Sequence, residues 1–224
     1  MLTLQVFLKR IIMPVLFAGV LFGSAGRWDL PMVWAYLCVY FISHLVIALA
    51  IIKQDPGLAK ERTRPGPGAK NWDRVWLTVY GFSCFAILIV AGLDIRFDWP
   101  GAVPLGVQLA GLVGFAAAVG LAVWALSVNA FFSSVVRIQR DRAHYVITAG
   151  PYQYVRHPGY VGSALFWLCT ALALGSWWAM LPATLVVLQY ILRTALEDRT
   201  LHEDLEGYAE YAERVRYRLL PGIW

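Results

Sequence analysis

The residues best suited to chemistry lie in a short polar segment between two apolar stretches. It reads His144-Tyr-Val-Ile-Thr-Ala-Gly150-Pro151-Tyr152-Gln-Tyr154-Val-Arg156-His157-Pro158-Gly-Tyr160. Gly150-Pro151 predicts a turn, and Pro158 suits the first position of a helix, where proline lacks only a donor that is unpaired anyway. We expect free backbone N–H groups at this helix start to favour a carboxylate. The alternative is a belt of interfacial tyrosines, with Arg156 reaching toward lipid head groups.

A second polar segment follows the last apolar stretch and begins Arg193-Thr-Ala-Leu-Glu197-Asp198. Arg193 and Glu197 are four residues apart, so they share one face of a helix. As an exposed ion pair they would add only a few tenths of a kcal/mol. They adjoin an apolar run, however, where charged side chains are costly and usually functional. After Gly207, residues 208–221 are amphipathic, and we expect them to fold back as a lid.

Several other kinds of site are not indicated. The sequence contains no Gly-rich phosphate loop, His-Glu-x-x-His or Gly-x-Ser-x-Gly pattern. The three cysteines lie inside apolar runs without Cys-x-x-Cys spacing, which favours small buried side chains over a disulfide or zinc cluster (Cys38, Cys84 and Cys169). We therefore predict no metal site.

The composition shows what must position these residues. Of 224 residues, 59% are hydrophobic and only 15% are charged, against about 25% charged in a soluble domain. A fold of this size cannot hide such an excess in one core. The apolar runs are also too long, and alternate too little, for barrel strands. We predict an all-α, polytopic membrane helical bundle.

Five runs contain no Asp, Glu, Lys or Arg: residues 11–26, 30–52, 75–93, 99–136 and 157–192. About 20 apolar residues cross a bilayer as a helix, so the first three runs fit one crossing each. The fourth is expected to begin in an interfacial loop at Trp99-Pro100-Gly101. The fifth is expected to form two short helices, broken at 175–178. The sum is five to six transmembrane helices, with a C-terminal helical hairpin and an amphipathic tail.

The loops alternate in charge. Segments 53–74 and 131–158 are rich in Lys and Arg, whereas the intervening connections are not. By the positive-inside rule both basic loops are cytoplasmic, together with Lys9-Arg10 and the tail 193–224. The net charge of +5 then follows from topology, with the lipid bilayer as partner and no nucleic acid. We expect one domain over 1–224, with scaffold helices in 1–98 and a catalytic part in 99–224.

The two polar segments together resemble the isoprenylcysteine carboxyl methyltransferase family. This family belongs to a superfamily of membrane methyltransferases that use S-adenosylmethionine and include the phospholipid methyltransferases. The resemblance rests on residues 150–162, on Glu197-Asp198-x-x-Leu201, and on Tyr208-x-x-Tyr211-x-x-Arg214-Val215. It covers residues 120–224 well. Two departures concern the acceptor side: the family's usual Glu-Glu pair is Glu197-Asp198 here, and its Phe-Gly is replaced by Leu205-Glu206-Gly207.

This resemblance implies S-adenosylmethionine as the methyl donor, bound in a cytoplasm-facing pocket. It places the stretch from Gln139 to His144, with Val146 and Tyr152, on the adenosine side. His157 and Tyr160 would meet the methionine portion, where aromatic rings suit a sulfonium cation. Arg193 and Glu197 would be the catalytic residues facing the acceptor. Arg193 would fix an anionic acceptor, and Glu197 would orient Arg193 or remove a proton.

Two other functions are alternatives to this one. The first is an NADPH-dependent membrane reductase, because residues 156–158 and 215–224 also resemble the C-terminal part of membrane sterol reductases. The second is a non-catalytic membrane adaptor. The acceptor stays open among a prenylated cysteine carboxylate, a phospholipid amine, a small thiol and another lipophilic acid. Because the chain looks compact and prokaryotic, we expect a lipophilic or small acceptor at a prokaryotic inner membrane, with the active site facing the cytoplasm.

Overall fold

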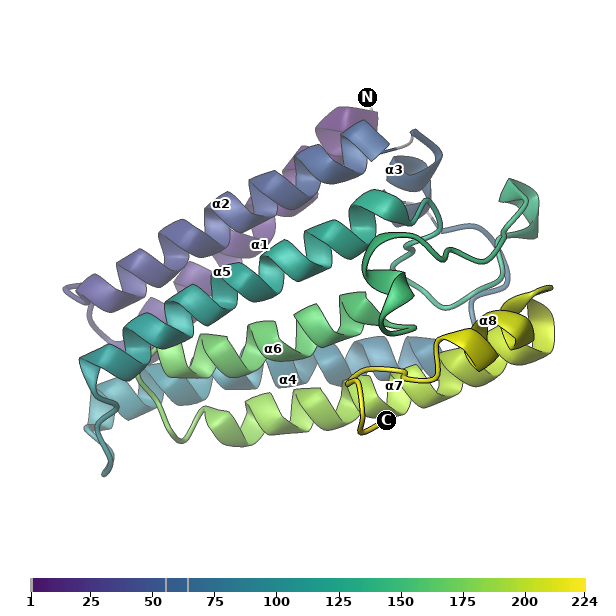
Figure 1. Cartoon of the computed structure of the whole chain (residues 1–224). Coiled ribbons are helices and arrows are strands. Elements are labelled where there is room, and N and C mark those ends of the chain that lie inside the picture. Colours follow the sequence, from purple (N-terminus) through teal and green to yellow (C-terminus); the bar gives the residue numbers. More distant parts are fainter. Residues whose placement is uncertain (1, 55, 64) are drawn as a thin grey trace.

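The computed structural model describes residues 2–54, 56–63 and 65–224, which form helices and connecting loops (Figure 1). The structure does not describe the side chains of residues 1–10, 54–56 and 63–64. The α-helices in chain order are α1 (Leu2–Ala25), α2 (Pro31–Gln54), α3 (Pro56–Thr63), α4 (Asn71–Phe97), α5 (Leu105–Val128), α6 (Pro158–Ala173), α7 (Met180–Asp204) and α8 (Tyr208–Arg214). Two 3-10 turns, η1 (Arg140–Arg142) and η2 (Gly150–Gln153), interrupt the long loop between α5 and α6.

Four of these helices, α2, α4, α5 and α7, are long and apolar enough to cross a membrane. Two shorter apolar helices, Ile11–Ala25 within α1 and Pro158–Ala173, pack beside them. The 16 residues of α6 span about 24 Å at the usual helical rise. The protein is therefore an integral membrane protein built as a helical bundle, as the uncharged runs predict.

The predicted interruptions of the last two runs are confirmed. Helix α5 begins at Leu105 after the N-cap Pro104. The connection between α6 and α7 contains Gly175 at φ +76°, and Ser176 Oγ accepts the backbone N–H of Ala179. Only α6 is short, however: α7 has 25 residues, because the helix continues through residues 193–204 after the apolar run ends.

Small residues let α5 and α6 approach closely, side by side in Figure 1. A Cβ added to Gly111 would lie 2.7 Å from the backbone nitrogen of Ala173, and one on Gly162 would lie 2.8 Å from the carbonyl oxygen of Ala118. Such contacts between small residues are the usual basis of helix packing in lipid. They fix α6, whose first turn belongs to the site described below.

The three cysteines differ in environment. Cys84 is buried and Cys169 is half-buried, but Cys38 on α2 is exposed. The prediction that all three are buried was wrong for Cys38. The outward faces of a membrane helix are as apolar as its inward faces, so an apolar run alone does not show which face a residue occupies.

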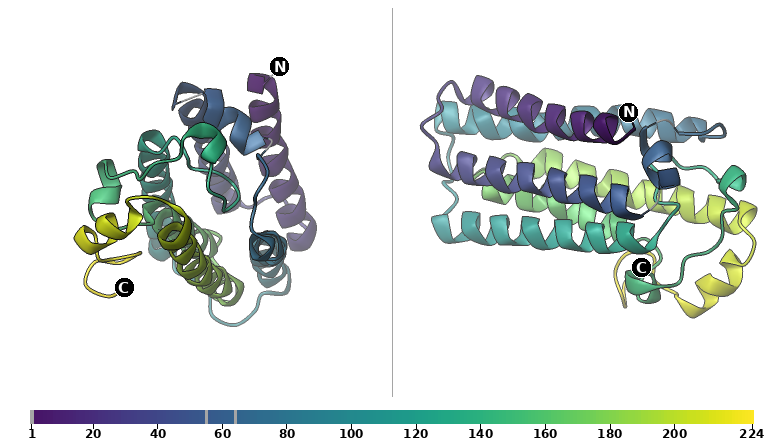
Figure 2. Two further views of the ribbon diagram at one scale, coloured as in Figure 1. Left: turned by 90° about the vertical axis from the view of Figure 1, so that its right-hand side faces the viewer. Right: turned by 90° about the horizontal axis from the view of Figure 1, so that it is seen from above.

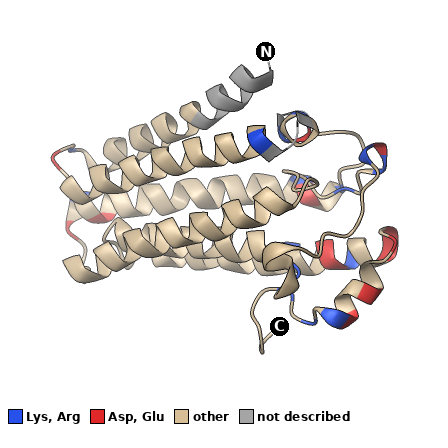
Figure 3. Ribbon diagram, turned by 45° about the horizontal axis from the view of Figure 1, so that its top comes forward, with Lys and Arg blue, Asp and Glu red and all other residues tan. Residues whose placement is uncertain are grey.

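Charged residues gather at the two ends of the bundle (Figure 3). The end that carries α3, the α5–α6 loop and α8 holds most of them (Figure 3). At the opposite end, the α1–α2 connection contains Arg27 and Asp29, and the end of α4 with the residue after it contributes Asp94, Arg96 and Asp98. Figure 2 shows the polar loops and the C-terminal tail at the same end of the helices. The two basic loops and the tail thus share one end, as predicted; the side chains of Lys9 and Arg10 lie outside the description.

Candidate active site

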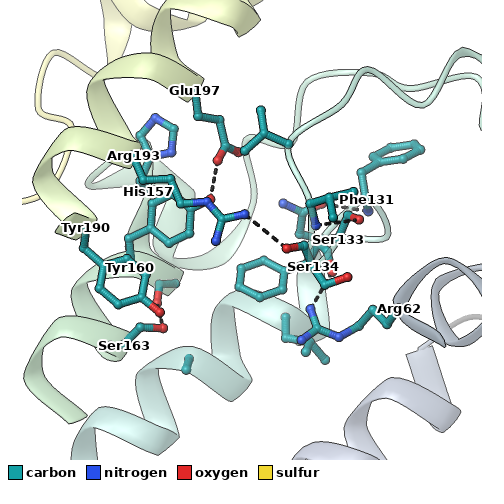
Figure 4. Close-up of a pocket in the computed structure, with 18 of the residues that line it drawn as sticks. Arg62, Phe131, Ser133, Ser134, His157, Tyr160, Ser163, Tyr190, Arg193 and Glu197 are labelled. Carbon is teal, nitrogen blue, oxygen red and sulfur yellow. Dashed lines mark hydrogen bonds between the residues drawn. The ribbon is translucent and has the colours of Figure 1, made fainter. Parts of the chain in front are cut away.

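A cavity of about 550 Å³ is lined by loop residues at the charged end and by residues of the helices that form the bundle. Its polar part is formed by the α5–α6 loop, the first turn of α6 and the last turns of α7 (Figure 4). Its deeper part is lined by aromatic side chains of α1, α2, α4 and α6: Phe17, Tyr40, Trp76, Tyr80, Phe166 and Trp167. Both parts of the chain, 1–98 and 99–224, therefore contribute to one cavity.

Seven of the eight predicted site residues line this cavity: His144, Val146, Tyr152, His157, Tyr160, Arg193 and Glu197. The eighth, Gln139, is 1% exposed and lies behind the wall. Its side-chain amide donates to the carbonyl of Phe131, and its backbone N–H donates to Nδ1 of His144. Gln139 thus supports two residues of the wall rather than facing the cavity itself.

His144 is a neutral member of the wall. Its ring lies 4.3 Å from the ring of Phe131, centroid to centroid. Burial, together with the positive charges of Arg142 and Arg137, lowers the pKa of His144 to about 4. At neutral pH this part of the cavity therefore carries an uncharged imidazole that accepts a hydrogen bond at Nδ1.

Helix α6 begins at Pro158, as the sequence predicts, with His157 at the N-cap position. The rings of His157 and Tyr160 lie nearly parallel, with centroids 5.7 Å apart and planes 5° apart. The backbone N–H groups of Arg156 and His157 donate to the carbonyls of Tyr217 and Arg218. The returning C-terminal tail occupies both of these donors, which precede the helix. The ligand carboxylate expected at the start of α6 itself stays a prediction.

Asp198 connects this tail to the site, a role that the sequence analysis did not assign. It is 1% exposed and accepts hydrogen bonds from Arg156 Nε at 2.8 Å, Arg218 Nε at 2.8 Å and the Tyr208 hydroxyl at 2.8 Å. Nε2 of His157 lies 3.2 Å from the same carboxylate. One buried anion therefore joins α7, the start of α6, α8 and the tail. Its position beside Glu197 was the available signal.

Arg193 reaches across the cavity wall toward α4. Its Nη2 lies 3.0 Å from Oδ1 of Asp73 and donates to the carbonyl of Ser134 at 3.1 Å. The guanidinium carbon lies 4.2 Å from the ring centroid of Trp76 and 5.3 Å from that of Tyr160. Its Nε is buried without a hydrogen-bond partner among the described residues. The guanidinium is thus held between two aromatic rings and paired with Asp73 through Nη2.

Glu197 accepts a hydrogen bond from the hydroxyl of Tyr160, as Figure 4 shows. The hypothesis that Glu197 orients Arg193 is not supported by this geometry, because the carboxylate paired with Arg193 is Asp73. Four-residue spacing places Arg193 and Glu197 on one helix face, but tertiary packing supplied a nearer anion. Asp73 gave only a weak signal in the sequence, an acidic residue just before an apolar run.

Comparison with known proteins bears on the part of the chain that contributes most of these residues. Residues 107–206 match the family described as phospholipid methyltransferase, and this stretch includes all eight predicted site residues. Within the described residues, no group of three or more His, Cys, Asp or Glu is arranged to hold a metal ion.

A curated relative is the protein-S-isoprenylcysteine O-methyltransferase of Schizosaccharomyces pombe, which is 31% identical over 86 residues, or 38% of this chain. The alignment spans 36% of that protein, so the chain matches about a third of its relative's length. The resemblance inferred from the two motifs is thereby confirmed: residues 107–206 are similar to the phospholipid methyltransferase family, and 38% of the chain is similar to an isoprenylcysteine O-methyltransferase.

Proposed function

We propose that this protein is an integral membrane methyltransferase that uses S-adenosylmethionine and methylates a lipophilic or small acceptor. One observation carries the proposal: His157 and Tyr160 from one motif and Arg193 and Glu197 from the other line a single cavity. These residues lie inside the segment that matches the methyltransferase family.

The polar part of the cavity suits a cationic methyl donor. S-Adenosylmethionine supplies a methyl group on a positively charged sulfur. The parallel rings of His157 and Tyr160 offer aromatic faces, which attract such cations. His144 adds no positive charge at neutral pH, since its pKa is about 4. Glu197 adds a carboxylate beside Tyr160.

The aromatic part of the cavity suits an apolar acceptor. It extends from Arg193 and Trp76 toward Phe17, Cys84 and Trp167 within the bundle, and cavities of such size commonly enclose small molecules. Arg193 lines the cavity beside Trp76 and supplies a cation there. An acceptor with an apolar body and an anionic carboxylate or thiolate would satisfy both features.

In this proposal the chain acts by positioning. Arg193 holds the acceptor anion, and Glu197 receives a proton if the acceptor arrives protonated. The tail, with Tyr208 and Tyr211 buried against the loop, excludes water from the polar part. Holding two reactants in near-attack geometry can supply roughly 7–11 kcal/mol of the barrier reduction. We further propose that the site faces the cytoplasm of a prokaryotic inner membrane, which the basic loops at its end of the bundle support.

The first test is ligand binding by the purified protein in nanodiscs. A saturating ligand at about 100 times its Kd stabilises a protein by about 2.7 kcal/mol, which raises Tm by about 5–10 °C in a chain of this size. We expect this shift with S-adenosylmethionine or its demethylated product. A shift with NADPH instead would support the reductase alternative, and the absence of any shift would support a non-catalytic adaptor.

The second test identifies the acceptor. The protein is incubated with radiolabelled S-adenosylmethionine in separate reactions, each of which contains one class of acceptor: extracted lipids, lipophilic acids or small thiols. We expect label in a lipophilic acid or thiol. Label only in phospholipid amines would contradict the role given to Arg193, because a second cation is not expected beside a guanidinium.

A further inference from the structure

Arg193 in the candidate site is paired with a residue of α4, a helix that lies outside the segment matching the methyltransferase family. Asp73 lies in the first turn of α4, whereas the match begins at residue 107. Asp73 is 0% exposed, and its Oδ1 lies 3.0 Å from Nη2 of Arg193 on α7. The two residues are 120 positions apart in sequence and join α4 to α7.

Asp73 is itself fixed from a third direction. Its Oδ2 accepts the backbone N–H of Val136 at 2.7 Å, so the α5–α6 loop, α4 and α7 meet at this carboxylate. One turn along α4, the ring of Trp76 lies 4.2 Å from the Arg193 guanidinium carbon. Its Nε1 donates to the carbonyl of Gln189 at 2.7 Å, which fixes the plane of that ring.

These contacts restrict the orientation of the Arg193 guanidinium. Nη2 is taken by Asp73 and by the carbonyl of Ser134, while Nε stays buried and unpartnered among the described residues. Arg193 and Trp76 line the cavity, but Asp73 does not. Asp73 therefore has no direct access to a ligand and acts only through Arg193.

We propose that Asp73 is a positioning residue that holds the guanidinium of Arg193 in the orientation in which it binds the acceptor anion. The inference rests on the proposed function and extends it to α4. It implies that residues 1–98 do more than support the catalytic part, since α4 sets the direction of the acceptor-binding cation.

A neighbouring ion pair provides the matched control. Lys70 Nζ lies 3.0 Å from Asp204 Oδ2, also between the α4 region and α7, but these side chains are 37% and 35% exposed. Asp204 does not line the cavity. A purely structural role for Asp73 predicts that its loss acts through stability alone, as the loss of Asp204 would.

The test compares Asp73→Asn, Arg193→Ala, the double variant and Asp204→Asn. Asparagine keeps an oxygen for the Val136 N–H but removes the charge that holds Arg193. We expect Asp73→Asn to lower kcat/KM for the acceptor by about 100-fold, the cost typical of a 1 Å misplacement. The dissociation constant for S-adenosylmethionine should stay within about twofold. In the Arg193→Ala background the same substitution should change turnover by less than about threefold, and Asp204→Asn should match the wild type.

Binding of decanoate, measured by calorimetry, provides a readout that needs no turnover. We expect Asp73→Asn to weaken decanoate binding about tenfold or more relative to wild type and Asp204→Asn. Equal losses from Asp73→Asn with and without Arg193, or unchanged decanoate binding, would overturn the inference. If the wild type neither binds S-adenosylmethionine nor transfers methyl groups, while decanoate binding still depends on Asp73, then the proposed function is wrong and the positioning role stands.

Discussion

Replacing Asp198 by asparagine tests the tertiary connection on which the site depends. The carboxylate accepts two hydrogen bonds from Arg156, at 2.8 and 3.0 Å, and the side chains of both residues are 5% exposed or less. Removing one partner of such a buried pair usually costs about 3–5 kcal/mol, because the other charge is left uncompensated. Arg218, whose side chain is 35% exposed, adds at most about 1 kcal/mol after solvent screening.

We therefore expect Asp198→Asn to destabilise the protein by about 3–5 kcal/mol, which lowers Tm by roughly 6–20 °C. The affinity for S-adenosylmethionine should fall as well, because His157 and the tail lose their common anchor. Thermal unfolding in nanodiscs and calorimetric titration measure the two effects. Glu203→Gln, which breaks the exposed pair with Arg199 on the same helix, is the control and should leave both values unchanged. A Tm for Asp198→Asn within 2 °C of wild type would refute this reasoning.

Three further predictions concern other parts of the molecule. Arg193→Ala should abolish most turnover while calorimetry finds S-adenosylmethionine binding close to wild type; loss of both would contradict an acceptor-side role. Gly162→Ala should destabilise the bundle by about 1–3 kcal/mol, since its Cβ would lie 2.8 Å from the Ala118 carbonyl oxygen, whereas Gly120→Ala, with open space around it, should not lower Tm. His144 has a folded pKa of about 4, below its ordinary 6.5, so the unfolded chain binds the proton more readily. The contribution of neutral His144 to the free energy of unfolding should be fully present above pH 6.5. It should decline as the pH falls toward 4, with a loss of about 2 kcal/mol at pH 5. His144→Asn should remove this slope in unfolding measured across that range, and an unchanged slope would show that His144 is not the titrating group.

The C-terminal tail illustrates an intermediate case between sequence and structure. Its amphipathic pattern predicted that it folds back, and Tyr208 and Tyr211 are indeed buried against the loop. The pattern did not show that the tail's carbonyls at Tyr217 and Arg218 would take the amides ahead of α6. Backbone pairing between distant segments leaves no trace in side-chain composition.

The amino-acid sequence by itself determined the helices and the segments that bear the chemistry. Uncharged runs set the spans, Pro158 set the start of α6, and the break at 175–178 separated α6 from α7. Each of these depends on residues close together in the chain, so local rules of hydropathy and backbone conformation suffice.

Tertiary structure alone decided which side chains meet. Spacing suggested that Glu197 orients Arg193, yet α4 places Asp73 beside that cation and Glu197 bonds Tyr160 instead. Gln139 likewise lies behind the wall that it was predicted to form. A buried charge pairs with the nearest anion that packing provides, and that neighbour depends on how distant helices pack rather than on spacing within one helix.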